Sequence, residues 1–228
     1  MFTSSMDNRK AFSIMNSTEF FDKHKYVTVT NFIDEQTCSL LYNHVINNAK
    51  RLAYLMTTKD YVHDEGRYGT FNDSQAPGCF SLYGDPIMDS LLELGTQKME
   101  TITGKKLVPT YSYHRLYETD AELLKHKDRP SCEISTTLCL GYNTSNLEEK
   151  HKDWNWPMFV DGKPIHMKKG DMIVYRGCDV EHWREPFPGL NHAQVFLHYN
   201  EIGSEFDENK NDGRPLLGLP ADYNQFSK

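Results

Sequence analysis

The chain has 228 residues, of which 38% are hydrophobic and 25% are charged, and its formal net charge is −7. This is the composition of a globular protein, and it excludes disorder over most of the chain. The acidic balance argues against nucleic acid as a partner, because non-specific affinity for phosphate backbones comes mainly from Lys and Arg. The sequence has no run of about 18 apolar residues and no apolar N-terminal segment of signal-peptide type, so we expect a cytoplasmic protein without a membrane span.

The five cysteines form no Cys-x-x-Cys pair, and their number is odd. A disulfide framework or a thiolate zinc site is therefore not expected. We interpret these residues as buried, reduced cysteines.

The N-terminal part begins with a polar segment and continues as a strand and a helix. We expect residues 1–22 to be loosely ordered and residues 23–228 to form a single domain. Tyr26–Thr30 has the composition of a strand. Apolar residues at helical spacing predict a helix over about 34–49, with Asp34 as its cap.

A long irregular stretch separates this helix from a second one. Residues 57–84 are rich in Gly, Asp, Tyr and Thr without periodicity, which is typical of a functional loop. The second helix is predicted over about 85–103. Asp85 caps it, Pro86 lies in its first turn and Gly104 follows its end.

After this helix the pattern changes to short strands. They are expected at Val108–Tyr117, Glu133–Tyr142, Trp156–Val160, Met172–Tyr175, Val180–Arg184 and Ala193–Tyr199. Helices followed by closely spaced strands predict an α+β, mainly β fold: a double-stranded β-helix, or jelly roll, with N-terminal supporting helices. The polar segment 143–153 interrupts the strands and is expected to be a surface loop or a lid.

Two His-x-Asp motifs are candidates for a metal site. In an extended chain, residues i and i+2 project to the same side, so both side chains of the motif can reach one ion. His126-Lys127-Asp128 lies between two expected strands, whereas His151-Lys152-Asp153 lies in the charged segment without a strand directly before it. The first motif is therefore favoured.

A third ligand is expected on a later strand. His182 follows a Gly-Asp turn, a short apolar strand and a second turn. We therefore predict that His126, Asp128 and His182 bind a metal ion. Two imidazoles and one carboxylate leave three coordination positions open, which suits non-haem iron(II).

At these residues the sequence resembles the iron(II)/2-oxoglutarate-dependent dioxygenases of the prolyl-4-hydroxylase-like superfamily. Tyr117 to Asp128 looks like the pattern of Tyr, turn and His-x-Asp, and Gly170 to Tyr199 looks like the Gly-Asp strand, distal His and closing strand. Shorter segments resemble an uncharacterised bacterial and phage branch. The resemblance implies Fe(II), O2 and 2-oxoglutarate as cofactors and co-substrates, with succinate and CO2 released as a peptide or small-molecule substrate is hydroxylated.

The resemblance also implies residues for the 2-oxoglutarate pocket. Tyr117 matches a Tyr that lines it. The pattern usually has Arg or Lys about ten residues after the distal His, where this chain has His192, a poorer partner for a carboxylate. Arg184 is the first substitute, because it lies two residues after His182 and shares its side of the strand. A surface ion pair with Glu181 or Glu185 is the alternative for Arg184.

Further candidates lie on two other strands. Arg115 shares a face with Tyr113 and Tyr117, and this alternation predicts either a polar, aromatic pocket wall or core packing. Gln194 shares a face of the last strand with His192 and His198. At least one of these three is expected to reach the pocket.

Two other functions fit the same pattern. A cupin-like hydrolase or isomerase would use zinc or manganese, but such sites usually add a fourth ligand. A non-catalytic jelly-roll module could bind a sugar on Trp154, Trp156 and Trp183. In every case we expect the loops 57–83 and 143–153 to select the ligand, because loops around a barrel mouth usually carry specificity.

Overall fold

The computed structural model describes residues 17–58, 67–148 and 156–224. The strands are β1 (Tyr26–Val29), β2 (Phe80–Tyr83), β3 (Leu107–Glu118), β4 (Leu123–His126), β5 (Ile134–Asn143), β6 (Met158–Val160), β7 (Lys163–Ile165), β8 (Met172–Tyr175), β9 (His182–Arg184) and β10 (Asn191–Glu201). The helices are α2 (Glu35–Thr58) and α3 (Pro86–Thr103), with 3-10 turns η1 (Pro130–Cys132), η3 (Asp207–Gly213) and η4 (Ala221–Tyr223).

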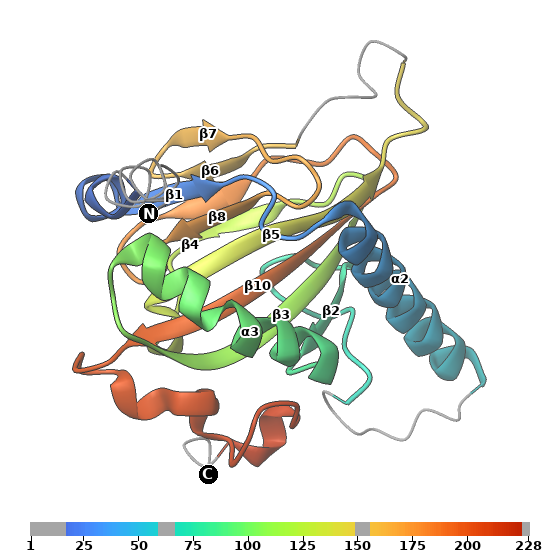
Figure 1. Ribbon diagram of the computed structural model, residues 1–228. Helices are drawn as coiled ribbons and strands as arrows, with labels where there is room; N and C mark the ends of the chain where they lie inside the picture. Colours follow the sequence, from blue (N-terminus) through green and yellow to red (C-terminus); the bar gives the residue numbers. More distant parts are fainter. Residues whose placement is uncertain (1–16, 59–66, 149–155, 225–228) are drawn as a thin grey trace, which may run out of the picture.

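Two antiparallel sheets form the body of the molecule (Figure 1). The larger sheet has the order β1-β8-β5-β10-β3-β2, and the smaller one has the order β4-β9-β6-β7. This is the α+β jelly roll that the sequence predicts, and that prediction is confirmed. In the described part of the chain, no helix combines the length and the apolar character needed to cross a bilayer.

The helices α2 and α3 cover the larger sheet, and their ends follow local capping rules. The Asp85 carboxylate accepts hydrogen bonds from the backbone of Ile87 and Met88, and Gly104 closes α3 in the left-handed conformation. The other helix, α2, continues nine residues past the predicted end near residue 49. Leu52 is buried and extends the apolar stripe of this helix, so packing against the core stabilises the longer helix.

Part of the predicted N-terminal disorder is wrong. Residues 17–24 are helical and Phe21 is fully buried in the main core, so this part of the chain is ordered by packing. Residues 1–16 lie outside the described residues.

The short strands β2, β4 and β7 were not predicted from the sequence. β2 forms inside the irregular stretch because it pairs with β3, and β7 contains a proline that only an edge strand tolerates.

The core separates into an outer layer and an inner layer. The outer layer lies between the helices and the larger sheet, where α2 and α3 pack on apolar side chains of β5 and β10. The inner layer lies between the two sheets. Because residues 134–141 of β5 are all buried, both faces of the central strands are covered. The inner face carries buried polar side chains, among them Arg115, Ser135, Gln194 and His198, which surround the candidate site.

Candidate metal centre

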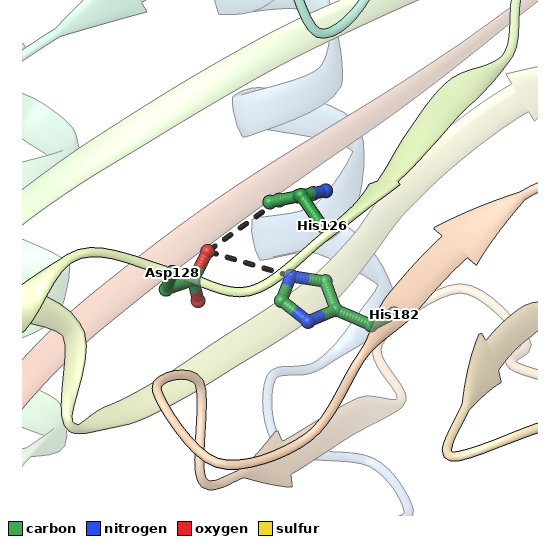
Figure 2. A group of neighbouring side chains, drawn as sticks. All are labelled: His126, Asp128 and His182. Atoms are coloured by element: carbon green, nitrogen blue, oxygen red, sulfur yellow. Dashed lines mark ion pairs between the residues drawn. The ribbon is translucent and has the colours of Figure 1, made fainter.

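The structure brings His126, Asp128 and His182 together at one end of the smaller sheet. His126 ends β4 and lies opposite His182, the first residue of β9. Oδ1 of Asp128 lies 3.5 Å from Nε2 of His126 and 3.4 Å from Nε2 of His182 (Figure 2). One ligand atom from each residue lies within 4.8 Å of the other two. Three side chains from two strands and a loop therefore point at one position.

Hydrogen bonds behind the two histidines fix which ring nitrogen faces that position. Nδ1 of His126 lies 2.6 Å from the carbonyl of Leu124, and Nδ1 of His182 lies 3.1 Å from the carbonyl of Val180. A carbonyl only accepts, so each Nδ1 carries the hydrogen, and in a neutral ring Nε2 keeps its lone pair. Two such lone pairs and a carboxylate oxygen then face one another. A cation between them satisfies all three, as in metal sites with carbonyl-bound histidines.

The carboxylate of Asp128 is held by the larger sheet. The hydroxyl of Ser135 donates to Oδ2 at 2.6 Å, which leaves Oδ1 for the histidines. A Cβ at Gly177 would collide with both the Asp128 carboxylate and the Ser135 hydroxyl, so only glycine fits beside them. Burial raises the pKa of Asp128, but in the metal-free centre imidazole rings that also carry a hydrogen on Nε2 donate to the carboxylate, outweigh burial and hold the pKa well below its usual range. The residue is therefore ionised and ready to bind a cation.

A cavity of about 340 Å³ opens in front of this centre. Its lining residues are Asp73, Gln75, Tyr83, Tyr111, Tyr113, Arg115, Leu123, His126, Lys127, Asp128, Arg129, Cys132, Tyr175, His182, Phe196 and His198. Of the residues predicted to bind 2-oxoglutarate, Tyr113 and Arg115 are in this wall. Arg115 already forms a buried ion pair with Asp73 and donates to Tyr117 Oη at 3.1 Å. Its charge is therefore compensated within the protein.

The other predicted residues, Tyr117, Arg184, His192 and Gln194, are buried between the sheets and do not line this cavity. Arg184 is 1% exposed and has no carboxylate partner in the described part of the chain. Nη1 donates to the Trp156 carbonyl at 2.8 Å, the guanidinium lies over the Trp156 ring, and Nε has no partner. The surface ion pair considered for Arg184 is therefore wrong.

Gln194 and His192 accompany Arg184. With the Gln194 amide turned so that its nitrogen donates to Thr137, its oxygen accepts from Arg184 Nη2 at 3.2 Å and from His192 Nδ1 at 3.1 Å. Burial, reinforced by the charge of Arg184, lowers the pKa of His192 well below its usual range. His192 is thus neutral, and Arg184 carries the positive charge of this cluster.

The sequence matches no protein-family model and no curated protein, but solved structures match in fold. A prolyl-4-hydroxylase from Pseudomonas putida superposes with a TM-score of 0.59 at 14% identity, over 83% of this chain and all of that one. A prolyl hydroxylase from Trichoplax adhaerens, in complex with a hypoxia inducible factor peptide, gives 0.57 at 11% identity over 92% and 96%. HygX from Streptomyces hygroscopicus, with nickel and 2-oxoglutarate bound, gives 0.54 at 8% identity over 87% and 89%.

This chain has the fold of the 2-oxoglutarate–Fe(II) oxygenases. At such low identity the likeness establishes the fold, and function must be argued from the site. Two alternatives that the sequence left open were a sugar platform formed by Trp154, Trp156 and Trp183 and a metal site at the second His-x-Asp motif. Trp156 is buried in the inner core, and the face of Trp183 is stacked on Phe159. The motif His151-Lys152-Asp153 lies outside the described residues, as does Trp154.

The structure also places residues in or beside the cavity that sequence reasoning missed. Asp73 and Tyr83 come from the irregular stretch 57–84, which was expected to be functional but gave no signal for single residues. Ser135 could have been found from the alternation of β5, since it lies on the inner face. Cys132 and His198 form a second group with Asp128, but burial raises the pKa of the Cys132 thiol well above its usual range.

Proposed function

We propose that this protein is an iron(II)- and 2-oxoglutarate-dependent oxygenase that hydroxylates a peptide or a small molecule. The observation that carries the proposal is the convergence of two carbonyl-bound histidines and one ionised carboxylate on one position. Three protein ligands of this kind leave three positions open, which suits iron(II), 2-oxoglutarate and O2. When bound, the iron and 2-oxoglutarate supply the oxidation of a C–H bond, with release of succinate and CO2.

The ligands themselves are positioned by neighbouring groups. The carbonyls of Leu124 and Val180 keep Nε2 of each histidine free of hydrogen. Ser135 holds the outer oxygen of Asp128, so that the inner oxygen faces the ion. Such outer hydrogen bonds fix ligand orientation and raise metal affinity.

Arg184 is our candidate for the far carboxylate of 2-oxoglutarate. It follows His182 by two residues on β9, so both side chains project to the inner side of the strand. A fully buried cation without a carboxylate partner is costly, and a bound carboxylate would offset that cost. Tyr117 and Gln194 flank this position, whereas His192 is neutral and helps to orient Gln194.

The comparisons with solved structures support the proposed oxygenase function. One solved structure of this fold contains nickel and 2-oxoglutarate, and another is a complex with a peptide fragment. The five cysteines of this chain are free, which fits the cytoplasmic location expected from the sequence. A sugar-binding module is less well supported, because neither described tryptophan lines the cavity.

Anaerobic visible absorption tests the proposal. Titrating the apo protein with iron(II) and then 2-oxoglutarate should give a weak charge-transfer band that needs both additions. Asp128→Ala and His182→Ala should abolish it, and His24→Ala, outside the centre, should leave it unchanged. Tight zinc or manganese binding without any such band would instead favour a cupin-like enzyme of another reaction class.

A further inference from the structure

The C-terminal segment reaches back to the cavity through Asp212. This residue lies in η3 and its side chain is 4% exposed. Arg129, which follows the candidate ligand Asp128 directly, donates from Nη1 to Oδ1 at 2.7 Å and from Nη2 to Oδ2 at 2.6 Å. The hydroxyl of Tyr83 also donates to Oδ2, at 2.6 Å. A residue 84 positions after Asp128 thus holds two side chains of the cavity wall.

The bidentate pair leaves a second set of donors on Arg129 unused. The other hydrogen of Nη1 goes to Ser131 Oγ at 2.9 Å. The Nε hydrogen and one Nη2 hydrogen, which point in parallel, have no acceptor in the described part of the chain. Arginine binds carboxylates through such a parallel pair. The Arg129 side chain is 47% exposed, so a ligand in the cavity can reach it although Asp212 is covered.

The guanidinium plane is fixed before any ligand arrives. It lies 4.5 Å above the ring of Tyr111, which in turn stacks on Tyr83 with ring centroids 4.8 Å apart. Arg214 fastens the C-terminal segment through a buried ion pair with Asp89 at 3.1 Å. A donor pair held in this way loses little conformational entropy when it binds an anion.

The charge balance of the cavity points to the same ligand chemistry. Arg115 is paired with Asp73, and Arg129 is paired with Asp212. Asp128 is committed to the metal by the proposed function. Lys127 is exposed between the two ligand residues and has no ion-pair partner in the described ranges. The Lys127 ammonium and the unused donor pair of Arg129 therefore remain for a ligand.

We propose that the substrate of this site carries a carboxylate, which Arg129 binds through Nε and Nη2 while Lys127 adds attraction. This inference rests on the proposed function, because it places the substrate next to the metal centre. Asp212 is a positioning residue that acts only through Arg129 and Tyr83. The substrate class thereby narrows from any peptide or small molecule to one with an acidic group near the carbon that is oxidised.

Isothermal titration with benzoate and benzamide tests the proposal, since the two probes share a shape and differ in charge. Wild-type protein, both metal-free and loaded with zinc(II) and saturating 2-oxoglutarate, should bind benzoate about tenfold more tightly, as expected for one charge-assisted interaction. Arg129→Gln should reduce this preference below about twofold, and Arg129→Lys should restore only part of it. Asp212→Asn should weaken benzoate binding without affecting benzamide.

Arg176→Gln, whose arginine lies outside the cavity and pairs with Glu201, serves as the matched control and should keep the benzoate preference. Equal binding of the two probes by wild type, including no binding of either at millimolar concentration, would overturn the proposal. A preference that survives Arg129→Gln, or one that 2-oxoglutarate removes, would overturn it too, because the donor pair would then not serve the substrate. Failure of the oxygenase assignment looks different: the absorption band is absent while the metal-free protein still prefers benzoate.

Discussion

Replacing Arg184 with Met tests whether this buried cation is retained for a ligand. Met keeps most of the apolar side chain against Trp156 and removes a buried Nε that has no acceptor, a relief of about 1–3 kcal/mol. It also removes the hydrogen bonds to the Trp156 carbonyl and to the Gln194 oxygen, about 0.5–1.5 kcal/mol each, and the contact with the indole face, about 0.5–2 kcal/mol. Met also ends the cost of burying a charge without a carboxylate partner, about 1–4 kcal/mol, so the gains and losses nearly cancel. The unliganded variant should therefore unfold within about 4 °C of wild type.

The effect on 2-oxoglutarate should be large by comparison. Loss of a charge-assisted contact to its far carboxylate costs about 3 kcal/mol, or about a hundredfold in affinity. Differential scanning fluorimetry with zinc(II), with and without 2-oxoglutarate, measures this directly, because a ligand that binds only the folded state raises the melting temperature. The rise should disappear in Arg184→Met. It should persist in Arg176→Met, a control whose arginine also has an unpartnered Nε but pairs with Glu201.

The reasoning is refuted if Arg184→Met melts far below wild type yet keeps its 2-oxoglutarate-dependent rise. Arg184 would then be a structural residue of the inner core, and the far carboxylate would have to bind elsewhere.

Three further predictions concern the supports of the centre and the acid stability of the fold. Ser135→Ala removes the hydrogen bond to Asp128 and should weaken zinc affinity about 10–100-fold in a competitive chelator titration; unchanged affinity would show that the loop alone orients the carboxylate. Gly177→Ala should weaken zinc binding at least as much as Ser135→Ala does and should lower the melting temperature, because the new methyl group displaces Asp128 and Ser135. A Gly177→Ala variant that binds zinc as tightly as wild type would contradict this packing. Burial lowers the pKa of His114 to about 4, against about 6.5 in an unfolded chain, so the unfolded state binds more protons between these values. The free energy of unfolding should therefore fall as the pH falls from 6.5 to 4, and this residue accounts for up to about 3 kcal/mol of that fall. Urea denaturation of His114→Phe should show a flatter dependence on pH over this range. Parallel pH profiles for wild type and variant would refute this role of His114.

The residues that sequence reasoning identified best are those whose positions follow from local rules. Alternation along a strand predicts which side chains share a face, so the two residues of His126-x-Asp128 and the inner tyrosines of β3 could be placed from spacing alone. The capping residues Asp85 and Gly104 likewise predicted the ends of α3. His182 could be joined to the motif because a turn, an apolar strand and a second turn precede it in a recognisable order.

What could not be predicted depends on contacts between distant segments. The partner of Arg115 is 42 residues away, in a stretch without periodicity, and the partner of Arg129 is 83 residues away. Glu185 and Glu181 lie close to Arg184 in the sequence, but the strand directs the Arg184 side chain inward, where it is buried against Trp156 instead of paired with a glutamate. The helix at residues 17–24 forms because Phe21 packs into the core, which the polar residues on either side of Phe20 and Phe21 do not indicate.

The centre draws its parts from both sheets, and this affects how the molecule moves. His126 and His182 belong to the smaller sheet, where β4 is a four-residue edge strand, whereas Asp128 is held by Ser135 of β5, a central strand of the larger sheet. An ion bound there ties a short edge strand of one sheet to a central strand of the other. Opening of the barrel mouth then requires release of the metal, so hydrogen exchange in β4 would report on metal affinity while exchange in β5 reports on global unfolding.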